Sequence, residues 1–177
     1  MTQLETKRLV LRPFTEDDAN AANTYERDVE VVRYASHGVR SLAESRAHIR
    51  GILEAELATP RSVYDFAVVR RDDARLIGRC GFRVTSFEQR EAMLWYVIER
   101  SCWGRGYSVE AARAVLAFGF DELHIHRFFA DIDPRNTASL RVAEKLGMRR
   151  EAHFVENALV KGEWTDSIIY GLLDRER

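Results

Sequence analysis

An α/β domain with about four helices is the fold class that this 177-residue sequence predicts. Strand-like and helix-like patterns alternate along the whole chain. Three consecutive strand patterns in the middle have short polar connections, which is typical of an antiparallel meander. The composition, 46% hydrophobic and 31% charged, is that of one domain with a hydrophobic core, so we expect a single domain over residues 1–177.

The N-terminal third predicts one strand and two helices. Residues 8–14, RLVLRPF, alternate apolar and polar side chains as a strand does, and Thr15 stands where the N-cap of the next helix is expected. Ser41 and Glu44 have the spacing of a capping box at the start of the second helix, and Pro60 ends that helix.

The rest of the chain predicts the meander and then alternating helices and strands. The three meander strands are YDFAVVRR, RLIGRCGFRVT and EAMLWYVIE, joined by RDDA and SFEQR. A helix to about Leu123 follows, then the strand RFFADID and a helix within NTASLRVAEKLG that Gly147 ends as a C-cap. The last two predicted strands are MRREAHFVE and TDSIIYGLL.

Charge, cysteine content and hydropathy argue against several functional classes. The 27 basic and 28 acidic residues give a net charge of -1, so we expect neither nucleic acid nor a membrane as a partner. Cys80 and Cys102 lack metal-ligand or redox spacing and suit a reducing compartment. There is no signal-peptide core or membrane-length apolar run, which predicts a soluble cytoplasmic protein. The histidines of HIHR, from His124, have no further ligand nearby, so no metal is expected.

Two glycines directly before a helix form the first candidate site. The segment from Trp103 to Ser108, which we call the glycine turn, joins the strand LWYVIE to the helix VEAARAVLAFGF. Free N–H groups at such a helix start bind anions, Gly104 and Gly106 let the backbone approach closely, and Arg105 adds a cation. On the glycines alone, an ordinary strand-to-helix turn remains an equal alternative.

Two familiar phosphate motifs do not fit the glycine turn. A dinucleotide-binding Rossmann turn would need a third glycine where Val109 stands, and it would not lie this late in the chain after a meander. A Walker-type loop would need Gly-Lys-Ser/Thr, which is absent from this turn.

The second candidate site follows the strand that ends in ADID. Pro134 leads to Asn136 at the start of a short helix, and Ser139 lies one turn later. An Asn at this position caps a helix by itself, so its functional meaning depends on its combination with the glycine turn.

Four segments together resemble the GCN5-related N-acetyltransferases (GNAT), and within them the ribosomal-protein N-terminal acetyltransferase (RimJ/RimL-like) type. They are LETKRLVLRPFTEDDA, WGRGYSVEA, NTASLRVAEKLGM and KGEWTDSIIYGLL, which occur in the family's order and span nearly the whole chain. The resemblance implies a mixed, mostly antiparallel, twisted sheet that splays open at its centre, with the cosubstrate acetyl-CoA lying in the split.

The resemblance also implies the coenzyme residues. The family's pyrophosphate motif falls on the glycine turn, where Trp103 and Ser108 depart from the general pattern; both departures are tolerable because backbone N–H groups do the binding. The strand before the turn would pair with pantetheine. The residues assigned to the coenzyme in this way are Tyr96, Val97, Ile98, Trp103, Gly104, Arg105, Gly106, Tyr107, Ser108, Val109 and Asn136.

The chemistry needs a base for the amine, a donor for the oxyanion and a proton for the thiolate. The position of the tyrosine acid of many relatives holds Ala143, so the resemblance to the Rim-like branch assigns this role to Ser139. The backbone N–H of Val97 is the expected oxyanion donor, and Asp131 is the expected base. Three other side chains remain open as the base, namely Asp133, His153 and Glu156. An amine with a lowered pKa, which would need no dedicated base, is a further alternative.

The acceptor amine depends on segments outside these motifs. Residues 31–40 and a loop at 156–164 would cover the acceptor side, with Tyr34, His37 and Trp164 as candidate contacts. The α-amine of a protein N-terminus and a small amine such as a polyamine, an amino acid or an antibiotic are both open. A non-catalytic acyl-CoA-binding module is the alternative from another class, and the resemblance leaves a homodimer open.

Overall fold

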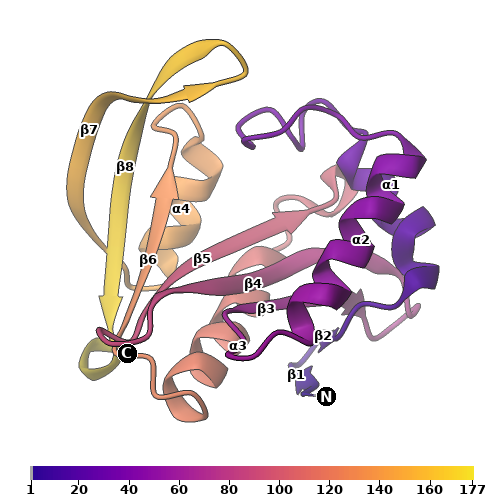
Figure 1. Cartoon of the computed structure of the whole chain (residues 1–177), viewed down its shortest axis with the longest axis horizontal. Coiled ribbons are helices and arrows are strands. Elements are labelled where there is room, and N and C mark those ends of the chain that lie inside the picture. Colours follow the sequence, from indigo (N-terminus) through magenta and orange to yellow (C-terminus); the bar gives the residue numbers. More distant parts are fainter. Residues whose placement is uncertain (1) are drawn as a thin grey trace.

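The computed structural model describes residues 2–177, and in this part of the chain eight strands form one sheet in the order β1-β2-β3-β4-β5-β6-β8-β7 (Figure 1). All neighbouring pairs are antiparallel except β5 and β6, which are parallel. The strands are β1 Leu4–Glu5, β2 Leu9–Arg12, β3 Val63–Arg70, β4 Leu76–Ser86, β5 Glu91–Ile98, β6 Arg127–Ile132, β7 Arg149–Val160 and β8 Glu163–Leu173. The mixed, mostly antiparallel sheet predicted from the sequence is confirmed.

Within residues 2–177, four α-helices cover the two faces of the sheet. They are α1 Ala19–Glu26, α2 Leu42–Glu56, α3 Tyr107–Asp121 and α4 Thr137–Lys145. The alternation along β3 shows the two faces directly, because Phe66 and Val68 join the cluster that contains α3, whereas Ala67 and Val69 join the cluster that contains α1 and α2. In Figure 1, α1 and α2 accordingly lie on the opposite side of the strands from α3.

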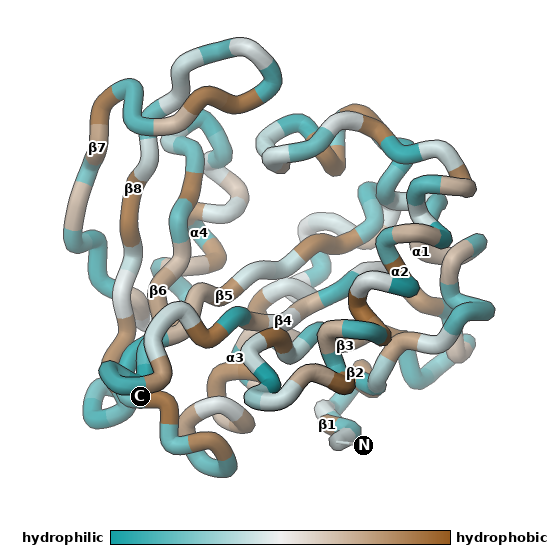
Figure 2. Tube along the Cα trace, in the orientation of Figure 1, coloured by the Kyte–Doolittle hydropathy of each residue, from teal (hydrophilic) through white to brown (hydrophobic). Residues whose placement is uncertain are grey.

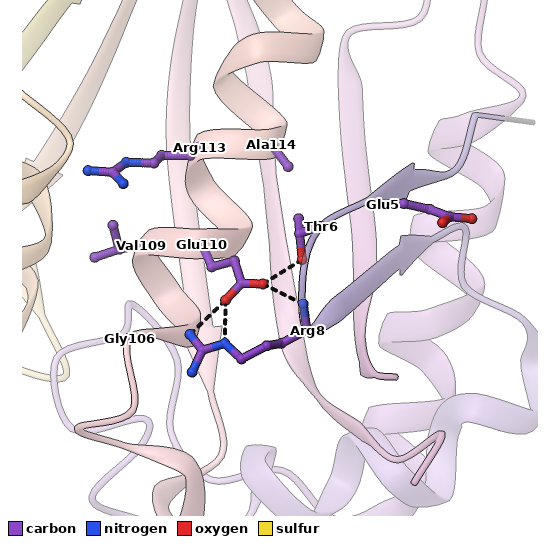
Figure 3. A pocket seen from close by; sticks show the side chains of 8 residues that line it. All are labelled: Glu5, Thr6, Arg8, Gly106, Val109, Glu110, Arg113 and Ala114. Carbon is purple, nitrogen blue, oxygen red and sulfur yellow. Dashed lines mark hydrogen bonds and ion pairs between the residues drawn. The ribbon is translucent and has the colours of Figure 1, made fainter. Parts of the chain in front are cut away.

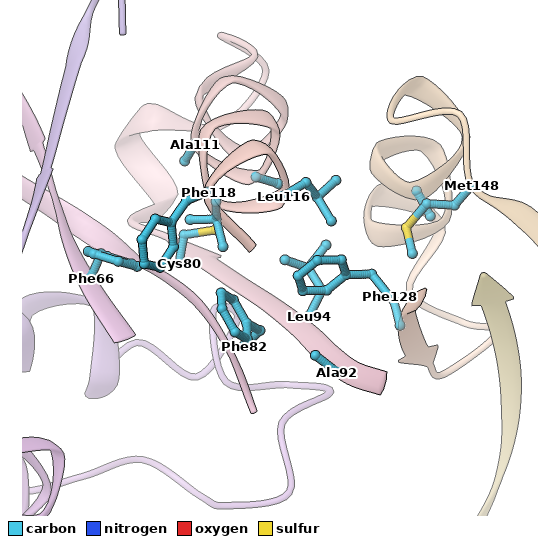
Figure 4. Packing of buried hydrophobic residues seen from close by; sticks show 14 of the residues in the cluster. Phe66, Cys80, Phe82, Ala92, Leu94, Ala111, Leu116, Phe118, Phe128 and Met148 are labelled. Carbon is cyan, nitrogen blue, oxygen red and sulfur yellow. The ribbon is translucent and has the colours of Figure 1, made fainter. Parts of the chain in front are cut away.

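Aromatic side chains fill the core between the sheet and α3 (Figure 4). Phe82 and Phe128 pack edge to face with ring centroids 5.1 Å apart, and Phe120 packs on Phe128 at 5.0 Å in the same way. A Cβ at Gly119 would lie 2.3 Å from the Phe128 ring, so the glycine is what lets α3 approach β6. In Figure 2, short runs of hydrophilic and hydrophobic residues follow one another along the outer strand β7, whose side chains are mostly exposed.

Several local predictions are confirmed. Ser41 and Glu44 form the expected capping box, and the meander strands β3, β4 and β5 pair in sequence order. Gly147 follows α4 with φ +82°, as a helix C-cap glycine does.

Three details differ from the sequence prediction. Thr15 caps a 3-10 turn, Glu16–Asp18, before α1 begins, because the Asp18 carboxylate accepts hydrogen bonds from Thr15 and from Arg12 and holds this turn tight. The short strand β1 was not expected. The loop expected at residues 156–164 is mostly strand, because β7 continues to Val160 in a hairpin with β8.

The centre of the sheet opens between β5 and β6. Only Glu91 to Met93 pair with Arg127 to Phe129, after which the two strands diverge, as Figure 1 shows. The remainder of β6 stays paired with β8 and the remainder of β5 with β4, so each strand keeps one bonded edge and one open edge. Within residues 2–177, no helix has both the length and the apolar character needed to cross a membrane.

Candidate active site

The glycine turn presents a run of free backbone amides at the start of α3. Within residues 2–177, the structure gives no hydrogen-bond acceptor for any N–H from Gly104 to Val109, and the first helical bond is from the Glu110 N–H to the Gly106 carbonyl at 3.1 Å. Gly104 and Gly106 have φ of +74° and +79°, which side chains rarely tolerate. Six consecutive N–H donors at a positive helix end therefore form a cradle that suits a diphosphate.

Trp103 ties this turn to the end of β5. Its indole Nε1–H donates to the Ile98 carbonyl at 2.7 Å, while about half of its side chain (48%) stays exposed. The Trp that replaces the general motif residue therefore has a structural function, because it fixes the distance between the turn and the open edge of β5.

The open edge of β5 presents the backbone of Tyr96 and Ile98. Glu99 donates its N–H to Ile77 in β4, and the backbone groups of successive strand residues point to opposite edges. Val97 therefore directs its N–H and C=O toward β4, and Tyr96 directs both toward the split. Of the three residues expected to pair with pantetheine, Val97 is the one that the structure turns away, and its N–H does not face the position expected for an oxyanion.

Tyr96, Asn136 and Ser139 come together where α4 begins. The Asn136 Oδ1 accepts the Ser139 N–H at 3.1 Å, which is an ordinary N-cap, and the Tyr96 hydroxyl donates to the Ser139 carbonyl at 3.0 Å. Burial raises the pKa of the Tyr96 phenol well above its ordinary value. The half-buried Ser139 is thus held against β5 through its backbone, and its hydroxyl has no hydrogen-bond partner among residues 2–177.

Asp131 lies on the opposite face of the sheet from α4. Its neighbours Ala130 and Ile132 are buried in the α3 cluster, so its own exposed side chain points to the side of α1 and α2. No hydrogen bond or ion pair holds its carboxylate within residues 2–177. Asp131 and Ser139 therefore approach the split from its two faces.

Two of the alternative bases are engaged elsewhere. Asp133 binds Arg135 at 2.6 Å, and this hydrogen bond lowers the pKa of the Asp133 carboxyl. The His153 Nε2 lies 2.8 Å from the Asp166 Oδ2. Glu156 is exposed, with φ +48°, and its N–H donates to the Asp166 carboxylate at 2.9 Å.

The side of the split that is expected to receive the acceptor, which we call the acceptor side, is bridged by a lysine at the tip of the β7–β8 hairpin. The Lys161 Nζ donates to the Val32 and Arg33 carbonyls at 2.7 and 3.1 Å, which joins the hairpin to the loop between α1 and α2. The Arg135 guanidinium lies over Tyr34 in this loop, 5.9 Å from the centroid of the Tyr34 ring. The hairpin and the α1–α2 loop therefore meet above the split, as Figure 1 also shows.

The other two predicted acceptor residues are placed differently. The His37 Nδ1 lies 2.8 Å from its neighbouring Gly38 carbonyl, and burial lowers the pKa of its imidazole. Trp164 lies in β8 opposite Leu159, with 62% of its side chain exposed. No contact joins it to Tyr34 or His37 within residues 2–177.

A group of charged side chains beneath the α1–α2 loop, of which Glu26 and Asp65 are buried and the others partly buried, was not anticipated. It consists of Glu26, Arg40, His48, Asp65 and Arg79, which we call the buried ion network. The Glu26 carboxylate lies 2.6 Å from both Arg40 and His48, the His48 Nε2 lies 2.8 Å from Arg79, and Arg79 pairs with Asp65. Single charges inside the apolar runs VYDFAVV and LIGRCGF were the sequence signal for it.

The network keeps the Glu26 carboxylate ionised. Burial alone raises the pKa of Glu26, but hydrogen bonds from His48 and Ser45 and the charge of Arg40 outweigh it, so that the pKa of Glu26 is about 2. Asp65 also accepts the Trp95 indole N–H at 3.3 Å. Because Trp95 lies on the same face of β5 as Val97, the network links the α1–α2 loop to the strand that borders the split.

Comparisons with known proteins agree with this geometry. The family described as "Acetyltransferase (GNAT) domain" matches residues 8–149. The uncharacterized N-acetyltransferase YnaD of Bacillus subtilis (strain 168) is 33% identical over 174 residues, 98% of each chain. The ribosomal protein uS5-alanine N-acetyltransferase of Escherichia coli (strain K12) is 28% identical over 178 residues, 96% of this chain and 90% of that protein.

Solved structures share the fold over its full length. A GNAT-family acetyltransferase from Bacillus anthracis superposes with a TM-score of 0.88 at 30% identity, over 99% of this chain and 100% of that one. The spermidine N-acetyltransferase from Vibrio cholerae, solved in complex with CoA and spermine, has a TM-score of 0.83 over 97% of this chain and 98% of that one. Its 18% identity supports the fold alone.

Proposed function

Because this chain belongs to the GNAT family of acetyltransferases, we propose that it moves an acetyl group from acetyl-CoA to the α-amine of a protein N-terminus. The observation that carries the coenzyme half of the proposal is the run of six free amides from Gly104 to Val109, next to the open edge of β5. The first feature suits a pyrophosphate and the second suits the amide groups of pantetheine. Asn136 would contact the pantetheine arm from the start of α4.

The chain's own residues would serve the acyl transfer from both faces of the split. Asp131 would take the proton from the amine on the α1 and α2 side, directly or through water. The amine nitrogen then forms its bond to the thioester carbon, and the carbonyl oxygen accepts the Tyr96 N–H, which faces the split in place of that of Val97. Loss of the C–S bond leaves a thiolate, to which the Ser139 hydroxyl would donate a hydrogen bond.

Two observations bear on the acceptor. The similarity to a uS5-alanine N-acetyltransferase over 96% of the chain supports a protein N-terminus and a place in the RimJ/RimL-like branch. The Lys161 contact to the α1–α2 loop narrows the acceptor side and supports the alternative of a small amine. A polyamine belongs to that alternative, since a structural neighbour was solved with spermine.

The test begins with calorimetric titration of the purified protein with acetyl-CoA. Thiol release is then followed with a panel of N-terminal peptides, including one that begins with alanine, and of small amines. Binding with peptide-dependent release is the expected result. Thiol release with small amines alone would replace the protein N-terminus by a small amine as the acceptor. Absence of acetyl-CoA binding would overturn the coenzyme assignment.

Ser139→Ala tests the catalytic assignment within the same assay. The hydroxyl has no hydrogen-bond partner within residues 2–177, so its removal leaves the fold intact. We expect kcat to fall about tenfold or more while the affinity for acetyl-CoA changes less than about twofold. An unchanged kcat would show that Ser139 does not serve the thiolate.

A further inference from the structure

We propose that Arg8 is a positioning residue that holds the glycine turn from behind and so aims its amides at the coenzyme; this inference rests on the proposed function. Arg8 lies directly before β2, nearly one hundred positions before the turn it contacts. Its guanidinium donates to the Arg105 carbonyl at 3.0 Å and lies 4.5 Å from the Tyr107 ring centroid (Figure 3 shows its setting).

The contact with the Arg105 carbonyl fixes the direction of the next amide. In a trans peptide the C=O of one residue and the N–H of the next point in opposite directions. Because Arg8 holds the carbonyl of Arg105, the N–H of Gly106 is directed away from Arg8 and out of the turn. A Cβ at Gly106 would lie 3.6 Å from the Arg8 Nη2, so the guanidinium lies directly against this backbone.

Glu110 holds Arg8 in this position. Its Oε2 accepts the Arg8 Nε–H and pairs with Nη2, both at 2.6 Å, and its Oε1 accepts the Arg8 N–H at 2.8 Å. The Thr6 hydroxyl adds a further hydrogen bond to Oε1 at 2.7 Å. One carboxylate thus holds the guanidinium through Nε and Nη2 and the backbone through its N–H, so Arg8 loses much of its freedom, which is what positioning requires.

Charge compensation gives Arg8 a second effect on anion binding. Glu110 lies in the first turn of α3, next to the amides that would hold a diphosphate. Partial burial by itself raises the pKa of Glu110, but the hydrogen bonds from Thr6 and Arg8 outweigh it and keep that pKa below its ordinary value. Glu110 is therefore ionised, and without Arg8 its charge would repel the coenzyme phosphates.

These contacts border an open cavity of about 520 Å³ between β1 and α3 (Figure 3). The cavity is lined by both members of the Arg8–Glu110 pair and by Gly106. The pair thus lies at a surface that solvent and salt can reach. We therefore expect its loss to change the affinity for the coenzyme more than the packing of the core.

The experiment compares Arg8→Gln with Arg71→Gln, using two acetyl donors. Arg71, in the turn between β3 and β4, is exposed, pairs with Glu5 and donates to the Thr6 carbonyl, so its replacement removes the same charge next to the same N-terminal segment. Acetyl-CoA carries the pyrophosphate, whereas S-acetylpantetheine lacks it. Affinity is measured by calorimetry and by competition, and kcat and KM are measured with the amine that releases most thiol.

We expect Arg8→Gln to raise Kd and KM for acetyl-CoA about 10- to 100-fold, with kcat changed less than about twofold. Its constants with S-acetylpantetheine, and all constants of Arg71→Gln, should match the unchanged protein. An equal loss with both donors would show a merely structural role and overturn the inference, as would an unchanged affinity for acetyl-CoA.

The double variant Arg8→Gln/Glu110→Gln guards against a loss that comes only from local unfolding. If the repulsion by Glu110 contributes, this variant regains about threefold or more of the lost affinity for acetyl-CoA. A further loss instead would overturn charge compensation by Arg8. If the unchanged protein itself does not bind acetyl-CoA, the proposed function fails together with this inference, whereas a failure of Arg8→Gln alone leaves the proposed function standing.

Discussion

The coenzyme side and the acceptor side of the split are built on different physical principles. On the coenzyme side, consecutive backbone amides of the glycine turn would do the binding, and most of this turn is exposed. On the acceptor side, the α1–α2 loop lies over the buried ion network, whose charges come from helices, strands and the loop itself.

This difference determines which changes each side tolerates. Backbone binding depends on φ and ψ at a few positions, so only substitutions that disturb the turn matter there. A buried ion network depends on every partner, because removal of one leaves another charge buried without compensation. We therefore expect coenzyme affinity and global stability to respond to separate sets of substitutions.

Gly106→Val is the change with the largest expected effect. With φ at +79°, a β-branched residue would force the backbone out of this conformation and misdirect the amides. We expect the affinity for acetyl-CoA to fall by about 100-fold or more, which is about 2.7 kcal/mol. Calorimetry provides the measurement.

Gly147→Val is its matched control. Gly147 has φ +82°, and a Cβ there would meet no atom within 4 Å, so the same strain arises without any contact to the glycine turn. Stability should fall in both variants, but only Gly106→Val should lose coenzyme affinity. An equal loss of affinity for acetyl-CoA in both variants would contradict the expectation that coenzyme affinity and global stability respond to separate sets of substitutions.

Glu26→Gln addresses the acceptor side. Glu26 is 2% exposed and holds Arg40 and His48, so its neutralisation should lower the free energy of unfolding at pH 7 by about 3 kcal/mol and leave coenzyme affinity unchanged. Urea unfolding measures the first quantity and calorimetry the second. The exposed Glu88→Gln in the β4–β5 turn should change neither.

The same variant should also change the pH dependence of stability. The pKa of Glu26 is about 2 in the folded protein, below its ordinary value of 4.5, so the unfolded chain takes up this proton first as the pH falls. Its contribution is complete above about pH 5 and is lost toward pH 2. The difference in stability between the unchanged protein and Glu26→Gln should therefore shrink over this interval; a constant difference would contradict the lowered pKa.

Trp103→Phe should have a moderate effect on the coenzyme side. It removes the indole N–H that donates to the Ile98 carbonyl and leaves most of the aromatic surface in place. The loss of about 1 kcal/mol corresponds to a roughly fivefold weaker affinity for acetyl-CoA. Trp164→Phe, at an exposed position in β8, is the control and should leave that affinity unchanged.

Lys161→Met should have the smallest effect. Methionine keeps the apolar stem but loses both hydrogen bonds to the α1–α2 loop, at a cost below about 1 kcal/mol in stability. KM for the acceptor should change about two- to fivefold and KM for acetyl-CoA should not. Lys145→Met, in the exposed last turn of α4, should alter neither KM, and a changed KM for acetyl-CoA in Lys161→Met would contradict the separation of the sides.

Features that depend on neighbouring residues were predicted well from the sequence. The capping box of Ser41 and Glu44 and the glycine that ends α4 need only a few consecutive residues, and the structure has both. The extent of β7 was wrong because its last residues pair with β8, for example Leu159 with Trp164, and pairing of this kind overrides local preference.

The sequence by itself determined the order of most elements and the position of the glycine turn, because local periodicity, caps and glycine spacing specify them. The family followed from the resemblance of four segments in their order along the chain. Only the tertiary structure decided that Val97 turns its amide away from the split, since that depends on the pairing of β5 with β4. It also decided that Arg8 meets Glu110 and that Glu26 meets His48. Such contacts join residues far apart in the chain, and short-range sequence patterns do not predict which charged side chains pair in the folded protein.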